Sequence, residues 1–141
     1  MDKLRKEVLA ISVHVTRLDK VEGSTGEAIM IYFTGHAECE AFKGSIINEG
    51  VDTQKNYYGM NKMLSARYML EGIDSKGEPC HLFIENNASI PLEEEEKIQT
   101  VPKIITDSKE LAWLETADLT GEIEFVNGDL VIHIFNELGE K

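Results

Sequence analysis

The chain between Met63 and Ala88 reads MLSARYMLEGIDSKGEPCHLFIENNA, and this stretch decides the fold class. Two segments of alternating side chains flank a five-residue turn from Asp74 to Glu78. One antiparallel register starts with Ile73 opposite Pro79. On a nearly apolar face it pairs Leu70 with Leu82, Tyr68 with Ile84 and Ala66 with Asn86. On a charged face it pairs Arg67 with Glu85, Met69 with Phe83 and Glu71 with His81. A slip of one residue would scramble both sets. The hairpin therefore predicts a sheet with one face against a core and the other in water.

The end of the chain predicts a second hairpin. Its turn is Asn127 and Gly128, the residue pair best suited to a two-residue type I′ connection. The register that follows pairs Phe125 with Leu130, Ile123 with Ile132, Gly121 with Ile134 and Glu122 with His133.

Two further alternating segments precede the central hairpin. The first carries an apolar face from Leu9 to Val15, and the second runs from Ile29 to Ala41. The apolar face of the second segment ends in small residues, which are Gly35, Ala37, Cys39 and Ala41. Small side chains leave space that neighbours or a ligand must fill, so we expect a cavity beneath them.

The remaining segments are shorter. A third strand is predicted at residues 44–48, followed by a turn at residues 49–52 that leads into a polar connector. The region from Ile90 to Thr100, with four consecutive glutamates, is predicted to be a solvated loop. Asp107 and Glu110 have the spacing of a capping box and predict one short helix.

These elements predict one all-β domain over residues 1–141. No internal repeat or long linker divides the chain, and about seven or eight mostly antiparallel strands must stack as a sandwich or close as a barrel. Gly35 lies in the middle of a long strand, which can bend there and serve both halves of a rolled sheet. We therefore expect a single antiparallel, closed or nearly closed β-barrel of the calycin or lipocalin type with one short helix.

Composition excludes several classes of partner. The net charge of −12 repels polyanions, so nucleic acid is not expected to bind. The chain has no apolar run long enough for a membrane span and no signal-peptide pattern at its start, which predicts a cytoplasmic protein. Cys39 and Cys80 are then expected to be free thiols.

No cofactor is expected, because the sequence contains neither a phosphate-binding loop nor a dinucleotide fingerprint. His36, Glu38 and Glu40 alternate along one strand as the first ligands of a metal site could. They lie on the face opposite the apolar one, however, and a solvated outer face explains the same pattern. We therefore expect no metal.

The central segment resembles a known family. The motifs in question are Gly35, the glycine-led strand from Gly44 to Asp52, then Leu64, Ala66, Arg67 and Tyr68, then Asp74 and Gly77, and finally Ile84 to Asn87. In this order they are similar to domain of unknown function 3237, a family of uncharacterised bacterial and fungal proteins. The resemblance implies a β-barrel domain with a small-molecule pocket and supplies no catalytic residues. The chain departs from the family at residues 36–40, where a second glycine and an aromatic residue are usual, and at Ser65, which replaces an acidic residue.

Candidate site residues lie on both faces of the central hairpin. Tyr68 and Asn86 are polar groups on the otherwise apolar face, where they either satisfy each other or point into a cavity. Cys39 on the small-residue face and Asp52 at the edge complete the expected pocket.

On the charged face, Arg67 and Glu85 predict a cross-strand ion pair. A ligand role for this pair requires that a loop or partner covers the face, because a dry Arg67 would then need carboxylates such as Asp52 or Glu85 and could also orient a ligand carboxylate.

Three functions remain open at this point. The leading hypothesis is a barrel that binds a small, largely apolar molecule in its interior. The second is an enzyme that performs acid–base chemistry of the lyase or isomerase type in the same pocket. The third is a non-catalytic assembly domain that uses an exposed strand edge, and the sequence leaves homo-oligomer formation open.

Overall fold

The computed structural model describes residues 3–91 and 99–140. They form nine strands and one 3₁₀-helical turn. The elements are β1 (Lys3–Glu22), β2 (Gly26–Glu38), β3 (Phe42–Ile46), β4 (Gly50–Tyr57), β5 (Lys62–Asp74), β6 (Pro79–Ile90), β7 (Gln99–Thr106), η1 (Ala112–Glu115), β8 (Leu119–Val126) and β9 (Asp129–Glu140). None of the helical residues described forms a segment long and apolar enough to cross a membrane.

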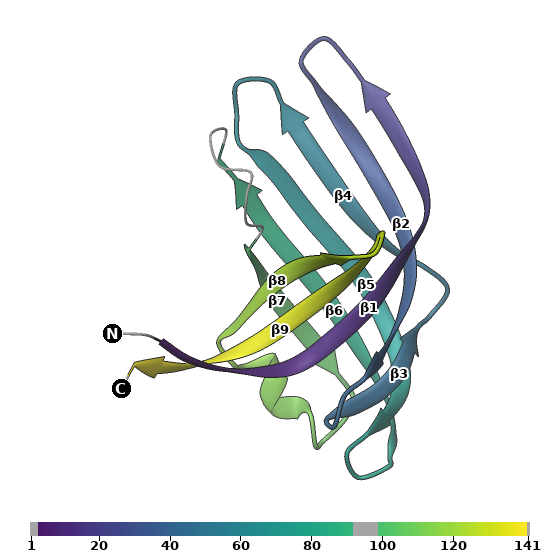
Figure 1. Cartoon of the computed structure of the whole chain (residues 1–141), viewed down its shortest axis with the longest axis vertical. Helices are drawn as coiled ribbons and strands as arrows, with labels where there is room; N and C mark the ends of the chain where they lie inside the picture. The colour runs from purple at the N-terminus through teal and green to yellow at the C-terminus, as the bar shows by residue number, and fades with distance from the viewer. Residues whose placement is uncertain (1–2, 92–98, 141) are drawn as a thin grey trace.

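The strands close into an antiparallel barrel (Figure 1). Strands β3 and β4 share one position between β2 and β5, because each pairs with a different stretch of both neighbours. The sheet then continues through β6, β7, β8 and β9 to β1, which pairs again with β2. Among the described residues, the pairing of β7 with β8 joins Gln99 to Glu122 and Thr100 to Gly121. The prediction of a closed or nearly closed all-β barrel is confirmed.

Both predicted hairpin registers are confirmed. In the first, Arg67 lies opposite Glu85 and Tyr68 opposite Ile84. In the second, Phe125 lies opposite Leu130, and the turn residues have the positive φ angles that a type I′ turn requires.

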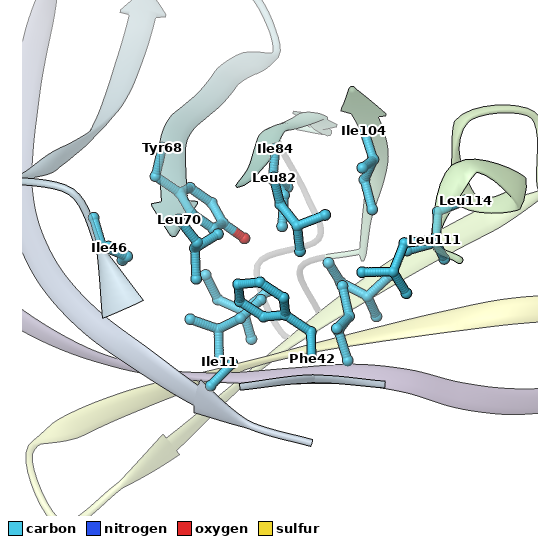
Figure 2. Close-up of a cluster of buried hydrophobic side chains, with 14 of the residues drawn as sticks. Ile11, Phe42, Ile46, Tyr68, Leu70, Leu82, Ile84, Ile104, Leu111 and Leu114 are labelled. Carbon is cyan, nitrogen blue, oxygen red and sulfur yellow. The ribbon is translucent and has the colours of Figure 1, made fainter. Parts of the chain in front are cut away.

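One end of the barrel is filled by a packed core, which Figure 2 shows as side chains that converge from β1, β3, β5, β6, β7 and η1. Phe42, Leu70, Leu82 and Ile84 are fully buried there. Burial of each such side chain contributes about 1.5–3 kcal/mol of transfer free energy.

The predicted capping box is wrong. Asp107 instead accepts hydrogen bonds from the backbone N–H of His81 (2.7 Å) and from its ring Nδ1 (2.7 Å), so its carboxylate is held by β6. The buried hydroxyl of Ser108 accepts from the N–H of Leu111 (3.1 Å) and donates to Asp74 (2.8 Å), and η1 itself has no side-chain cap. The result is the short 3₁₀ turn η1 rather than an α-helix.

The prediction that the second strand continues to Ala41 is also wrong. Strand β2 ends at Glu38, and the chain reverses so that the N–H of Cys39 donates to the carbonyl of Phe42 (2.9 Å). The small residues before this turn allow close packing and do not line the cavity of the barrel. A side chain at Gly35 would overlap the carbonyl oxygen of Ser12, and Ala37 is buried in the core, so β1 and β2 pack closely here.

The predicted loop at residues 90–100 overlaps elements on both sides. Ile90 ends β6, and Gln99 begins β7. The four glutamates at residues 93–96 lie outside the described residues.

Candidate ligand-binding site

A cavity of about 350 Å³ occupies the part of the barrel beyond the packed core. Its walls are mostly aliphatic and aromatic, and Asp52, Gln54, Asn86 and Thr100 supply the polar side chains. The lining residues are Val13, Val15, Ile31, Phe33, Asp52, Gln54, Leu64, Ala66, Asn86, Thr100, Ile123, Phe125, Gly128, Leu130 and Ile132. Ala66 lies opposite both Asp52 and Asn86 in the sheet, and its small side chain leaves room between them.

Asp52 faces this cavity from β4. The predicted turn and polar connector at this point are wrong, because residues Gly50–Tyr57 form a strand whose alternation points Asp52 and Gln54 inward. Gln54 donates a hydrogen bond to Asp52 Oδ2 (2.8 Å), whereas Asp52 Oδ1 is buried without a hydrogen-bond partner among the described residues.

The environment of Asp52 disfavours its charged form. Burial raises the pKa of the Asp52 carboxyl, and the hydrogen bond from Gln54 and the charge of Lys62 oppose that shift only in part. A carboxyl group with a raised pKa in a cavity can act as an acid, as a base or as a counter-ion.

Asn86 faces the cavity from β6, and a hydrogen bond to Tyr68 holds its side chain in place. The Asn86 side-chain N–H donates to the Tyr68 hydroxyl (3.3 Å), and Asn86 Oδ1 is buried without a partner among the described residues. The ring of Tyr68 packs edge-on against Phe33, with centroids 5.5 Å apart. Burial raises the pKa of the Tyr68 hydroxyl, so this group stays neutral near pH 7.

Thr100 is a site residue that the sequence interpretation missed. Its side chain is 4% exposed, it lines the cavity from β7, and its Oγ1 has no hydrogen-bond partner in the described part of the chain. No signal in the sequence identifies Thr100. It lies shortly after the acidic stretch, which predicts a loop, and its partner Gly121 is distant in the sequence. Gln54 was missed as well, although its spacing of two from Asp52 is a usable signal once β4 is known to be a strand.

Three side chains that line this apolar cavity each have a buried oxygen atom without a partner among the described residues. Buried polar atoms are almost always hydrogen-bonded in native proteins, and exceptions require an explanation. Asp52 Oδ1, Asn86 Oδ1 and Thr100 Oγ1 can each accept a hydrogen bond from a bound molecule.

Arg67 and Glu85 lie on the outer face, away from this cavity. Arg67 Nε donates to Glu85 Oε2 (2.7 Å), and the side chains are 62% and 28% exposed. Hydrogen bonds from Asn87 and then from Arg67 lower the pKa of Glu85. Arg67 also borders an outer hollow of about 800 Å³ with Lys55.

Cys39 is not brought together with Tyr68 and Asn86. It borders a separate hollow of about 570 Å³ together with Ala41 and Trp113. The backbone N–H of Ala10 donates to its Sγ atom (3.2 Å). Cys39 and Cys80 are both free thiols, as predicted.

His36, Glu38 and Glu40 are exposed. In the part of the chain that the structure describes, no group of three or more His, Cys, Asp and Glu residues could hold a metal ion.

No protein-family model and no curated protein matches the chain, so the resemblance to domain of unknown function 3237 stays a prediction. Solved structures are similar in fold. They include a protein of unknown function from Clostridium acetobutylicum (18% identity, 97% of this chain and 98% of that chain, TM-score 0.77), an enzyme from Penicillium herquei (14%, 97% and 96%, 0.72) and a β-barrel-like protein from Acinetobacter baumannii (16%, 97% and 97%, 0.71). At these identities the likenesses show the fold, which is that of a β-barrel.

Proposed function

We propose that this protein binds a small, largely apolar molecule inside the barrel, where Asp52, Asn86 and Thr100 accept hydrogen bonds from it. The observation that carries the proposal is the set of three buried oxygen atoms that lack partners among the described residues and belong to side chains lining an otherwise apolar cavity. A bound molecule with hydrogen-bond donors would satisfy these atoms, and its apolar body would cover the walls. The cavity volume also lies within the range of small-molecule sites, which is about 300–1,000 Å³.

A cavity-filling variant tests the proposal. Ala66 stands between Asp52 and Asn86, so Ala66→Phe places a ring where the ligand would lie. We expect the parent protein to enhance the fluorescence of aminoanthracene in a saturable way and Ala66→Phe to abolish the effect. Because the ring enters open space, the free energy of unfolding should change by less than the cost of overpacking a core, which is about 1–3 kcal/mol.

The matched control is Met69→Phe, on the same strand but on the exposed outer face. This variant should bind the dye as the parent does. If the parent gives no saturable signal and Ala66→Phe is strongly destabilised, the region is a packed core and the binding function is rejected.

A second candidate function is acid–base catalysis in the same cavity. The observation in its favour is Asp52, a cavity-lining residue whose carboxyl has a raised pKa and one oxygen without a hydrogen-bond partner among the described residues. The similar structure from Penicillium herquei is described as an enzyme, which makes the test worthwhile.

Nitrobenzisoxazole provides a probe of this chemistry that does not depend on the natural substrate. A carboxylate base removes the ring C–H proton, the electron pair of that C–H bond forms the third C–N bond of a nitrile, and the N–O bond breaks with its electron pair on the oxygen of the coloured phenolate product. We expect the parent to accelerate this reaction, with a rate that rises with pH through the pKa of Asp52, and Asp52→Asn to lower the rate about 100-fold. A rate that Asp52→Asn leaves unchanged would rule out Asp52 as the base.

A further inference from the structure

We propose that the ligand of the cavity is an organic amine in its cationic form, with the ammonium group on Asp52 and an apolar body against the barrel walls. This inference rests on the proposed function and narrows it to one class of molecule. Three features carry it: the charge of the lining residues, the kind of polar atom that lacks a hydrogen-bond partner and the apolar character of the walls.

The charge of the lining residues favours a cation. Of the described residues that line the cavity, Asp52 alone is ionisable, and none is Lys, Arg or His. An anionic ligand would therefore meet a carboxylate and no counter-charge, whereas a cation would neutralise a buried acid. The net charge of −12 adds a field that attracts cations to the protein.

The free polar atoms are arranged as acceptors. Gln54 donates to Asp52 Oδ2, and the Asn86 amide N–H donates to Tyr68, whereas Asp52 Oδ1 and Asn86 Oδ1 are buried without partners among the described residues. The unpartnered atoms of both residues are thus oxygens rather than N–H groups. An ammonium group has N–H donors and no acceptor, which matches this arrangement.

The walls provide for the rest of the molecule. Phe33 is buried in the cavity wall, whereas Phe125, near the tip of the β8–β9 hairpin, lines the cavity although it is 74% exposed. A ligand body that covers Phe125 would remove this aromatic surface from water. A cation near its ring would gain a further favourable interaction.

Lys62 is the charged group that competes with the ligand. The positive charge of Lys62, on β5, partly opposes the rise that burial causes in the pKa of Asp52. Asp52 nevertheless forms no ion pair among the described residues, so no close partner neutralises its charge. The nearby phenol of Tyr68 stays neutral because burial raises its pKa. Since burial also raises the pKa of Asp52, amine binding should weaken as the pH falls through that value and the carboxyl takes up a proton.

The test compares three probes with the same apolar body, phenylbutylamine, phenylbutanol and phenylbutanoate, by calorimetric titration at pH 7. We expect the amine to bind at least about tenfold more tightly than the alcohol, since ionised hydrogen-bond partners are about twice as strong as neutral ones. The carboxylate should bind most weakly. In Asp52→Asn the affinity for the amine should fall to that for the alcohol, while binding of the alcohol persists and shows that the cavity is intact.

Two further variants are matched to this one. Asp118→Asn changes the net charge by the same amount at an exposed position and should keep the preference for the amine. Lys62→Met removes the competing cation and should tighten amine binding.

The outcomes separate the two proposals. If the alcohol binds and the amine binds no more tightly, or if the preference survives Asp52→Asn, the ligand is not held as a cation and the inference is overturned while the proposed function stands. If none of the three probes binds to the parent, the proposed function fails and the inference fails with it.

Discussion

The Tyr68 hydroxyl determines which side of the Asn86 amide faces the cavity. It accepts the amide N–H at 3.3 Å, and the whole contact is buried. The apolar face of the central hairpin was predicted from the sequence, and Tyr68 and Asn86 stood out because they are the polar residues on it. The sequence could not predict that Tyr68 belongs to the core and holds Asn86 in place. The position of the Tyr68 ring depends on its contact with Phe33, which lies on a different strand.

Removal of that hydroxyl is our prediction at the scale of the residue. Tyr68→Phe leaves a buried N–H of Asn86 without its acceptor, which should lower the free energy of unfolding by about 1–3 kcal/mol. Urea denaturation measures the change. The control is Tyr32→Phe, a partly exposed tyrosine on the outer face of β2 that should change stability by no more than about 0.5 kcal/mol. An equal effect of both substitutions would show that the Tyr68–Asn86 hydrogen bond contributes nothing.

At the scale of the strand, predictability follows from the contrast between the two faces. The central hairpin and the C-terminal hairpin were predicted to the residue, because each has one apolar face and a turn that fixes the register. Strand β4 was missed because both of its faces are polar: Thr53 and Lys55 point outward, while Asp52 and Gln54 point into the cavity. The polar residues of β4 that line the candidate site therefore also remove the alternation of apolar and polar side chains from which a strand is predicted.

The same reasoning applies to the capping residue and to the small-residue strand. Asp107 has the sequence pattern of an N-cap, but β6 offers it a backbone N–H and an imidazole at the same time. Gly35 and Ala37 have the composition of a cavity wall, but the paired strand β1 lies so close that a side chain at Gly35 would overlap its backbone. In both cases a partner distant in the sequence decides the role, and no local pattern reveals that partner.

The free edge of β1 gives a prediction at the scale of the strand. Pairing of β1 with β9 ends at Val13 opposite Leu130, so among the described strands the stretch that follows pairs with β2 alone. Asp19 and Lys20 place opposite charges on this edge, and charged edge residues hinder edge-to-edge association. We expect the paired substitution Asp19→Val and Lys20→Val, which keeps the net charge, to increase self-association in light scattering.

The control is a second charge-neutral pair, Glu71→Val with Lys43→Val. These residues are exposed on β5 and β3, which have neighbouring strands on both sides, so apolar side chains there expose no free backbone groups. If both double variants associate to the same degree, apolar surface rather than the β1 edge is responsible.

For the whole molecule, the barrel combines a tightly packed end with a cavity that the β7–β8 junction borders. The core at the η1 end is built from fully buried side chains of several strands (Figure 2). The cavity lies beyond it, and there β7 and β8 are joined through Gln99 with Glu122 and Thr100 with Gly121. Thr100 lines the cavity from one side of this junction, and Ile123 and Phe125 line it from the other. A molecule in the cavity would therefore contact both sides of the β7–β8 junction.

Hydrogen exchange of the backbone amides should show this coupling. Because Thr100 lines the cavity and pairs with Gly121, whereas Leu70 and Leu82 are fully buried in the packed core, we expect the amides of Thr100 and Gly121 to exchange faster than those of Leu70 and Leu82. Binding of aminoanthracene should slow exchange at the junction, because the bound molecule has to leave before the two strands can separate. The amides of Leu70 and Leu82 provide the internal reference, since they lie outside the cavity lining and should respond only through global stability. Exchange at the junction that is as slow as in the core, or that a bound ligand leaves unchanged, would mean that the barrel closes without help from the cavity and that the ligand does not bridge β7 and β8.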